Sequence, residues 1–282
     1  ASRGHQVTLF EATNDIGGQF NLAKVVPGKE EFHETIRYFK VQIEKTGVDL
    51  RLNTRVNREQ LEREGFDEVI VATGVVPRSL KIDGGDAPQV LSYAEVLRGA
   101  PVGHKVAVIG AGGIGFDVSE FLLKPEHQPQ PQPLVDWMRE WGVDPNPNYM
   151  TEGGSVPSQV EPPIRQIYLM QRKTTPLGIG LGKTSGWVHR AQLKKHAVRM
   201  MRGVQYKSVS NEGLWIETDG HDQLLRVDTI VVCAGQESVK DLIPKEGEAT
   251  LANYHIIGGA KLAAELDAKR AIREGAEIAA AL

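Results

Sequence analysis

The sequence predicts an α/β protein built from two successive units in which strands and helices alternate. An apolar strand, Lys105–Ile109, runs into the glycine-rich turn Gly110–Gly115 and then into a helix that reaches about Leu123. An earlier strand, Gln6–Phe10, is also apolar and ends at Glu11. Short apolar runs that alternate with helical spacing are typical of a parallel sheet covered by helices. We therefore expect two Rossmann-like units.

The first unit is expected to lack the start of its sheet. Residues 1–5 are predicted to end a helix, because Arg-Gly-His is typical of a C-terminal stop. The strand at 6–10 fits the second strand of a βαβ unit, so the first strand and its glycine turn would precede Ala1. Apolar residues at helical spacing predict a helix from Lys29 to Lys45. The remaining elements are strands at Asp49–Leu52 and Glu68–Ala72 and a short helix at Tyr93–Arg98.

The second unit is expected to be interrupted by an insertion. Pro and Gln recur over residues 125–163, a composition typical of a segment outside the core, and only Val135–Trp141 has helical spacing there. The elements that follow are a strand at Gln166–Met170, a basic helix from Trp187 to about Met201, β segments at Val204–Val209, Gly213–Thr218 and Leu224–Cys233, and an Ala-rich helix at Ala260–Leu282. We expect residues 1–100 and 239–282 to form one domain and residues 101–238 the other.

Composition and charge argue against several classes of function. The 33 Lys and Arg residues against 36 Asp and Glu give a formal net charge of −3, so neither a nucleic acid nor a membrane surface is an expected partner. No apolar stretch approaches the roughly 20 residues that a transmembrane helix needs, and we expect a soluble, cytoplasmic protein. The single cysteine excludes an internal disulfide and a self-contained iron–sulfur cluster. The eight histidines are scattered, so no metal site is expected.

Three further side chains are expected to have structural roles. Cys233 lies in an apolar run and is predicted to be a buried thiol. Trp187 and Trp215 are predicted to lie in the core rather than against a cofactor. None of the three therefore adds a candidate site.

The glycines Gly110, Gly112 and Gly115 have the spacing of a dinucleotide-binding turn, and they lie between a strand and a helix. In such a turn the first glycine permits the bend, the second lets a pyrophosphate approach the backbone, and the third lets the helix pack on the strand. The phosphates would meet the positive end of the helix at Gly113 and Ile114. We predict dinucleotide binding here, and a glycine turn that serves packing alone is the alternative.

Arg172 and Lys173 follow the second strand of this unit, where an NAD-binding unit places Asp or Glu. A carboxylate would repel a 2′-phosphate, whereas a guanidinium can bind it through two hydrogen bonds. The sequence therefore favours NADP over NAD. An ordinary solvated basic turn is the alternative, and the insertion accounts for the long spacing from Gly115.

Glu11 occupies the corresponding position of the first unit and is a carboxylate, which suits an unphosphorylated ribose such as that of FAD. The residues that would let the backbone pass close to a flat cofactor are Gly17, Gly18, Ala72, Thr73 and Gly74. Because any surface strand can end in Glu, the prediction depends on these segments as well. Glu11 in the first unit and Arg172 in the second occupy equivalent positions but differ in charge. The two units are therefore predicted to bind two different nucleotides.

Several longer motifs are shared with one known family. In the first unit they are Phe10-Glu11, Ile16 to Ala23 (IGGQFNLA) and Pro27 to Phe32 (PGKEEF). In the second unit and the C-terminal segment they are Gly110 to Asp117 (GAGGIGFD), Glu140 to Asp144 (EWGVD), Gln171 to Lys173 (QRK), Gly180 to Arg190 (GLGKTSGWVHR), Cys233 to Gln236 (CAGQ) and Glu265 to Ile272 (ELDAKRAI). In order and wording they resemble the C-terminal FAD- and NADPH-binding region of bacterial 2,4-dienoyl-CoA reductases. The likeness covers essentially the whole chain.

The resemblance implies a fold of the glutathione-reductase type and an electron path from NADPH to FAD. In that family the path continues through a four-iron cluster and FMN to an unsaturated acyl-CoA in fatty-acid β-oxidation. FMN, the 4Fe-4S cluster and the acyl-CoA would belong to a domain upstream of Ala1. This chain would supply only hydride transfer from NADPH to FAD, which needs stacked rings and no side-chain acid or base.

The resemblance also carries cofactor-binding residues over by position. For FAD they are Glu11, Gly17, Gly18, Gln19, Val56, Ala72, Thr73 and Gly74, and for NADPH they are Gly110, Gly112, Gly113, Ile114, Gly115, Arg172 and Lys173. Ala234, Gly235, Gly259 and Ala260 are expected to contact a cofactor too. Lys261 departs from related flavoproteins, which usually place Asp there, although Lys can still donate to a hydroxyl or a phosphate.

Two alternatives stay open at the level of sequence. The chain could come from a related flavoprotein that acts on enoates or oxidises amines. It could also be a non-catalytic nucleotide-binding fragment or sensor that retains NADPH but not FAD. No catalytic side chain and no metal ligand is assigned under any of these interpretations.

Overall fold

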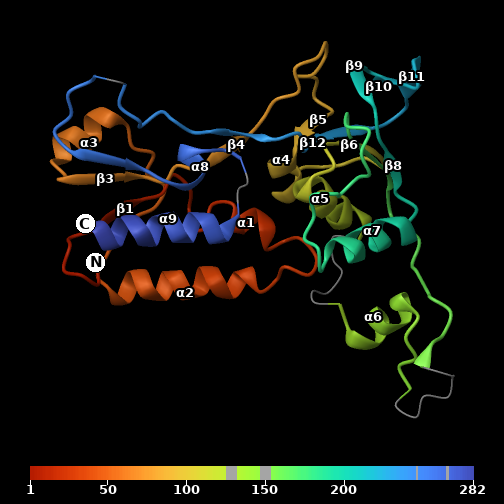
Figure 1. Cartoon of the computed structure of the whole chain (residues 1–282), viewed down its shortest axis with the longest axis horizontal. Helices are drawn as coiled ribbons and strands as arrows, with labels where there is room; N and C mark the ends of the chain where they lie inside the picture. Colours follow the sequence, from red (N-terminus) through yellow and green to blue (C-terminus); the bar gives the residue numbers. More distant parts are fainter. Residues whose placement is uncertain (125–131, 147–153, 246, 265–266) are drawn as a thin grey trace. The chain divides into compact units, whose positions relative to one another are not determined.

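A computed structural model of the chain describes residues 1–124, 132–146, 154–245, 247–264 and 267–282 (Figure 1). The chain divides into two compact units. The first comprises Ala1–Asn21, Phe32–Val76 and Gln236–Leu282, and the second comprises Leu22–Glu31 and Pro77–Gly235. This division reflects how the residues pack and does not test which cofactor each part binds. The predicted FAD domain (1–100 and 239–282) and NADPH domain (101–238) therefore stay predictions.

The first unit contains two pairs of short parallel strands with helices around them. Strand β1 (Thr8–Phe10) pairs with β2 (Asp49–Arg51), and β3 (Glu68–Val71) pairs with β14 (Asn253–Ile256). The helices are α1 (Phe20–Ala23, which continues into the second unit), α2 (Phe32–Lys45), α3 (Arg58–Glu64), α8 (Gly258–Lys261) and α9 (Ala268–Ala281). Local signals set the helix ends, since the side chain of Asn57 caps α3 and that of Asp267 caps α9.

The second unit is built on a five-stranded sheet in which neighbouring strands are parallel. Its strand order is β5 (Val90–Ser92), β12 (Thr229–Val232), β6 (Lys105–Ile109), β7 (Gln166–Met170) and β8 (Arg199–Met201). After their first residues, the central strands β12, β6 and β7 are buried and largely apolar because both faces of the sheet are covered. Helices α4 (Tyr93–Leu97), α5 (Gly113–Leu123) and α7 (Gly186–Lys195) contribute to the cluster on one face with Val106 and Val108.

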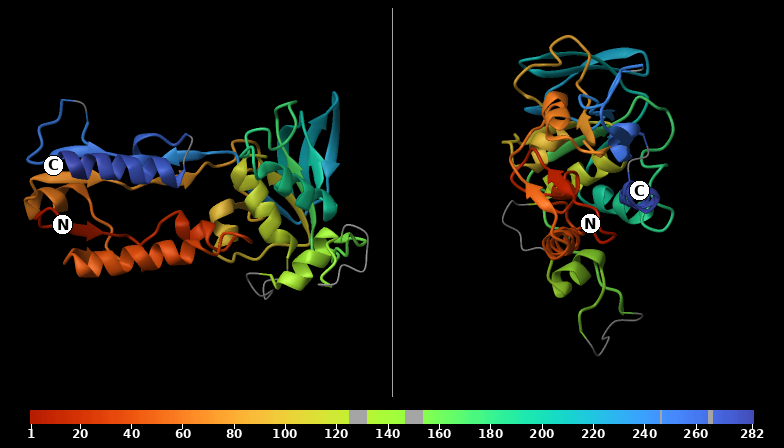
Figure 2. Two further views of the ribbon diagram at one scale, coloured as in Figure 1. Left: turned by 60° about the horizontal axis from the view of Figure 1, so that its bottom comes forward. Right: turned by 90° about the vertical axis from the view of Figure 1, so that its left-hand side faces the viewer.

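The other face is covered by antiparallel strands. They are β9 (Gln205–Ser210), β10 (Gly213–Thr218) and β11 (His221–Leu225), in the order β11-β10-β9, drawn together in teal and blue in Figure 2. Leu214 and Ile216 of β10 pack in one cluster with Ala107 and Ile109 of β6. Alternate residues of β6 thus face opposite layers, as the period of a strand requires. Helix α6 (Leu134–Trp141) belongs to the predicted insertion, and β4 (Val75–Pro77) pairs with β13 (Gln236–Ser238).

The predicted α/β fold with Rossmann-like units is confirmed, whereas several of the expected helices are wrong in extent; the helix expected from Lys29 begins at Phe32, for example. Residues 1–5 form a turn closed by the Gly4 N–H and the Ala1 carbonyl, 2.8 Å apart, and not a helix end. The basic helix ends at Lys195 instead of Met201, because Ala197 adopts a positive φ of 55° and the chain turns into β8. A helix cannot continue through a left-handed residue.

Two C-terminal segments are also divided where the sequence predicts continuity. The β segment Leu224–Cys233 is two strands, since Asp228 lies between β11 and β12 and its carboxylate accepts the Lys105 N–H at 2.7 Å. The helix expected at Ala260–Leu282 is α8 followed by a separate α9. Residues Glu265 and Leu266, and parts of the insertion at 125–131 and 147–153, lie outside the described residues.

The predicted environments of three side chains have mixed outcomes. Cys233 is a buried free thiol, as expected, and its burial together with the charge of Asp117 raises its pKa. Trp187 is 58% exposed and Trp215 is 40% exposed, so the prediction that they lie in the core is wrong. Among the described helices, none has the length and apolar character that crossing a bilayer requires.

Candidate functional site

The turn between β6 and α5 brings backbone segments so close that two glycines are required. A Cβ on Gly115 would lie 1.8 Å from the carbonyl oxygen of Gly110, and a Cβ on Gly110 would lie 2.6 Å from that of Cys233. Gly110 also has a φ of 109°, which other residues rarely adopt. Strand, turn and helix therefore pack directly against one another at the carboxyl end of β6.

The N-terminus of α5 is open on the outer side of the same turn. Gly112 is its N-cap residue and provides no side-chain hydrogen bond to the first turn. Cβ atoms built on Gly112 and Gly113 would meet nothing within 4 Å, and both residues are exposed. The first N–H groups of a helix lack partners within the helix and carry positive partial charge. The structure thus offers backbone donors and space for an anionic group at Gly112, Gly113 and the half-buried Ile114.

Arg172 and Lys173 lie at the carboxyl end of β7, the strand that pairs directly with β6. Both are exposed, and the side chain of Gln171 holds the backbone that follows by donating to the carbonyls of Lys173 (3.1 Å) and Thr175 (2.6 Å). Within the described part of the chain Arg172 forms no ion pair with a carboxylate. Its charge lowers the pKa of Tyr206, although burial dominates and raises that pKa overall. A guanidinium without a carboxylate partner is suited to a phosphate.

The carboxyl end of β12 lies on the other side of β6. Ala234 and Gly235 follow it and are exposed, and Gly235 has a φ of 107°. A cavity of about 250 Å³ borders Val232, and its polar lining includes Arg78, Ser92 and Glu95. The predicted residues of the second unit therefore share one edge of the sheet, in the order β12, β6, β7.

The cavity residues are not identified by the sequence analysis. Ser92 and Glu95 form a capping box at the start of α4, with mutual side-chain to backbone hydrogen bonds. The spacing Ser-x-x-Glu is a recognisable signal for this motif. Arg78 has no comparable signal, because its position beside Gly235 depends on strands far apart in the sequence.

In the first unit Glu11 follows β1 and its Oε1 accepts hydrogen bonds from the N–H and the hydroxyl of Thr13, both at 2.8 Å. No donor among the described residues binds the other carboxylate oxygen, which leaves it available to a ligand. Gly17 and Gly18 have φ of 118° and 47°, so the loop after Glu11 depends on glycine. Gln19 beside this loop is exposed, and Val56 is half-buried against the core of this unit.

The other predicted residues of the first unit converge at β4. The Thr73 hydroxyl donates to the carbonyl of Val239 at 2.7 Å, and Gly74 has a φ of 72° with open space where a Cβ would lie. Gly259 is packed so closely that its Cβ would lie 2.8 Å from Val75. Ala72 is exposed and is therefore accessible to a ligand. Ala260 is fully buried in this structure, so its surface is not accessible to a ligand here. Lys261 is exposed.

Helix α5 carries two acidic residues, each paired with a cation, that the sequence analysis does not identify. Asp117 accepts a hydrogen bond from Lys29 at 2.6 Å, and Glu120 lies 2.8 Å from Nδ1 of His189 on α7. The hydrogen bond to Glu120 raises the pKa of His189 above its usual 6.5, burial opposes this, and the charges of Glu120 and Asp117 add to it. The pair therefore joins α5 to α7 most strongly when His189 is protonated.

This pair predicts a stability that falls as the pH rises. Because the pKa of His189 is raised in the folded state, its contribution is complete below pH 6.5 and is lost as the pH rises through the raised pKa. We expect His189→Gln to lower the free energy of unfolding at pH 6 by about 0.5–1.5 kcal/mol and by less at pH 9. Urea unfolding at both pH values measures this. The exposed control His33→Gln should change neither value, and an equal loss at both pH values would contradict the assignment.

Both sets of residues fit a dinucleotide. In the second unit the fit depends on the open helix N-terminus at Gly112 and on Arg172, and in the first unit on Glu11 and the glycines beside it. The positive φ and empty space at Gly18 and Gly74 leave room for a flat group against the backbone.

Comparison with known proteins gives a family and several relatives. The family model described as pyridine nucleotide-disulphide oxidoreductase matches residues 1–258. The chain is 25% identical to a metal reductase of Desulforamulus reducens (86% of this chain and 36% of that protein) and 26% identical to a cinnamate reductase of Clostridium sporogenes (92% and 33%). It is also 40% identical over 77 residues to an N,N-dimethylglycine/sarcosine dehydrogenase of Chromohalobacter salexigens (27% and 11%). The chain thus spans about a third of the length of the first two relatives.

Solved structures support the same fold. A 2-naphthoyl-CoA reductase superimposes with a TM-score of 0.75 at 25% identity, covering 97% of this chain and 36% of the other. The thioredoxin reductase of T. acidophilum superimposes with a TM-score of 0.63 at 14% identity, covering 99% of this chain and 90% of the other. At that identity the second similarity concerns the fold alone.

Proposed function

The chain belongs to the pyridine nucleotide-disulphide oxidoreductase family, and from this premise we propose that it is the electron-input part of a flavin-dependent oxidoreductase. In this proposal the first unit binds FAD, the second binds NADPH, and a hydride passes from NADPH to FAD. The main support is an arrangement at one edge of the parallel sheet. The open N-terminus of α5 follows β6 there, and Arg172 follows the adjacent strand β7. Phosphate-binding groups on neighbouring strands suit a dinucleotide that crosses this edge.

The residues of the second unit have separate roles in binding NADPH. The backbone N–H groups at the start of α5 would bind the pyrophosphate, with Gly112 and Gly113 leaving room for it. Arg172, helped by Lys173, would bind the 2′-phosphate and select NADPH over NADH. Ala234 and Gly235 lie on the opposite side of β6 from Arg172, where the nicotinamide half of the cofactor would reach.

The residues of the first unit would hold FAD, which supplies a two-electron acceptor when bound. Glu11 would accept hydrogen bonds from the ribose hydroxyls of its adenosine through the oxygen that Thr13 leaves available. Gly17, Gly18 and Gly74 would let the backbone approach the cofactor. No side chain of the chain is assigned a proton-transfer role, because hydride transfer between stacked rings needs none.

We further propose that the complete protein is a reductase similar to 2,4-dienoyl-CoA reductase, with FMN, a 4Fe-4S cluster and the acyl-CoA site in another part of the polypeptide. Support comes from the shared motifs and from relatives named cinnamate reductase and 2-naphthoyl-CoA reductase. An amine-oxidising flavoprotein is the second candidate, favoured by the 40% identity to the dimethylglycine/sarcosine dehydrogenase. Unsaturated acyl-CoA and secondary or tertiary amines, offered to the full-length protein, distinguish the two.

The electron-input role is tested with the chain itself. Purified chain is mixed with FAD, freed of unbound flavin by gel filtration, and supplied with NADPH or NADH and an artificial electron acceptor. We expect retained flavin and acceptor reduction that is faster with NADPH. A chain that binds NADPH but retains no flavin and reduces no acceptor would instead be a nucleotide-binding module without activity of its own.

A further inference from the structure

Helix α6 is attached to the second unit by a charged residue instead of an apolar one. Of its eight residues only Glu140 is buried, with 6% of its surface exposed. The apolar side chains of Leu134, Val135 and Trp137 on the same helix are exposed. A carboxylate is costly to bury unless hydrogen bonds and opposite charges compensate it, so its partners decide where α6 lies.

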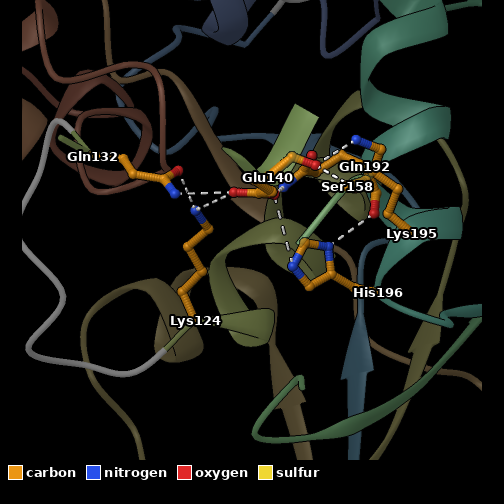
Figure 3. A network of polar contacts seen from close by, with 7 residues as sticks. All are labelled: Lys124, Gln132, Glu140, Ser158, Gln192, Lys195 and His196. Atoms are coloured by element: carbon orange, nitrogen blue, oxygen red, sulfur yellow. Dashed lines mark hydrogen bonds and ion pairs between the residues drawn. The ribbon is translucent and has the colours of Figure 1, made fainter. Parts of the chain in front are cut away.

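Glu140 is surrounded by six polar partners, shown in Figure 3. Its carboxylate accepts hydrogen bonds from the amides of Gln132 (3.0 Å) and Gln192, and it lies 3.8 Å from both Lys124 Nζ and His196 Nε2. Its backbone carbonyl accepts from the hydroxyl of Ser158 (2.5 Å) and from Lys195 Nζ (2.8 Å). Burial alone would raise the pKa of Glu140, but the hydrogen bonds from Gln192 and Gln132 and the charge of Lys124 hold it below its usual value. We refer to these seven residues as the Glu140 network.

Three members of the network belong to α7 or to its C-cap: Gln192, Lys195 and His196. The ammonium of Lys195 also lies over the ring of Trp141, 4.0 Å from its centre. Oε1 of Gln192 is buried and has no hydrogen-bond partner among the described residues, so the bond to Glu140 sets the orientation of this amide. The C-terminal half of α7 is therefore fixed by Glu140.

The N-terminal half of α7 in turn fixes the segment that leads from β7. Arg190 Nη1 donates to the carbonyl of Gly178 at 3.1 Å, and the Gly186 N–H donates to the carbonyl of Gly182 at 2.7 Å. Gly178 has no free space, because a Cβ there would lie 2.8 Å from Phe116 of α5. Residues 171–185 include Arg172 and Lys173. They are held at their start by β7 and by the Gly203 N–H, which donates to the carbonyl of Lys173 at 3.0 Å, and at their end by α7.

We propose that Glu140 is a positioning residue for NADPH: by fixing α7 it sets the segment 171–185, and with it the location of Arg172 at the 2′-phosphate. This inference rests on the proposed binding of NADPH in the second unit. It assigns the insertion a role in cofactor selection, because α6 supplies the carboxylate. The close contacts of the pyrophosphate-binding turn at Gly110–Gly115 are made by β6, β12 and α5, so Glu140 acts on this turn only indirectly, through the contact of α7 with α5.

The test compares binding of NADPH and of NADH by the full chain. Dissociation constants are measured from the fluorescence of the reduced nicotinamide for Glu140→Ala, for the isosteric Glu140→Gln and for Asp136→Asn, an exposed residue of the same helix. We expect Glu140→Ala to weaken NADPH binding by about tenfold and NADH binding by less than about twofold, since misplacing a charged group affects only the cofactor that it contacts. Glu140→Gln should have a smaller effect in the same direction, and Asp136→Asn none.

Hydrogen exchange gives a readout that does not depend on cofactor affinity. Amides of residues 171–178 should exchange faster in Glu140→Ala, whereas those of β6 should keep their protection. Equal weakening of NADPH and NADH binding, or unchanged exchange over 171–178 in both Glu140 variants, would overturn the positioning role. If the unaltered chain binds neither dinucleotide, the proposed function itself fails and the role of Glu140 fails with it. If the chain prefers NADPH and both Glu140 variants keep that preference, only the role of Glu140 is wrong.

Discussion

Gly115→Ala should destabilise the second unit more than a glycine-to-alanine substitution at any other position of the turn after β6. The new Cβ would lie 1.8 Å from the carbonyl oxygen of Gly110, a backbone atom that cannot rotate away. Either the helix α5 or the turn must move, and forced movement in a packed region costs about 3 kcal/mol or more. For a unit of this size such a loss lowers Tm by roughly 6–12 °C.

The effect on NADPH should exceed what the loss of stability alone produces. Moving α5 displaces the N–H groups that would bind the pyrophosphate, so we expect the dissociation constant for NADPH to rise by at least about tenfold even at temperatures where the variant is folded. Circular dichroism melting and nicotinamide fluorescence measure the two quantities separately.

Gly113→Ala is the matched control for stability. Gly113 is the first residue of α5, has no positive φ, and a Cβ there would meet nothing within 4 Å. Alanine favours a helix by about 0.8–1.0 kcal/mol over glycine in a helix interior, and so Gly113→Ala should be neutral or slightly stabilising. A Gly115→Ala protein as stable as the control would contradict the close packing at this turn.

The elements that the sequence predicts well are those whose signal is local. Strands β6 and β7 begin and end at the predicted residues, because central parallel strands are continuous apolar runs between polar ends. Helix α5 follows a glycine turn whose spacing is itself a signal. Helix α6 also lies within one residue of its prediction, although its burial of Glu140 could not be read from a helical pattern.

The elements that the sequence misses depend on contacts between distant residues. Strand β14 pairs with β3, and His255 on one contacts Glu68 on the other across 187 positions. The sequence predicts helix at β8 because Arg199-Met200-Met201 has no strand pattern of its own, and this segment is a strand through its pairing with β7. The break before it depends on Ala197, a residue type that seldom adopts a positive φ.

The candidate site divides in the same way. Gly110, Gly115 and Arg172 are identified from spacing within one βαβ unit, and the structure brings them to one edge of the sheet. The pair of Lys29 with Asp117, which are 88 positions apart, could not be found from spacing. Such a pair can be identified only from the tertiary structure, since the sequence around neither residue indicates its partner.

Arg172→Glu should change cofactor selection more than any other single substitution in the chain. A guanidinium can bind a 2′-phosphate through two charge-assisted hydrogen bonds, whereas a carboxylate at the same place repels it. Arg172 is exposed and forms no ion pair with a carboxylate in the described part of the chain, so its replacement leaves no buried charge behind. We expect NADPH binding to weaken by on the order of 100-fold, equivalent to about 3 kcal/mol, and NADH binding to change by less than about fourfold.

Two further variants separate charge from position. Arg172→Lys keeps the charge but not the planar pair of donors, so it should lie between the unaltered chain and Arg172→Glu. Lys105→Glu reverses an exposed charge at the amino end of β6, the opposite edge of the same sheet, and should leave the preference for NADPH unchanged. Because the two charge reversals alter the net charge equally, a comparable loss of NADPH binding in both would mean that the overall charge, and not a 2′-phosphate site at Arg172, sets the preference.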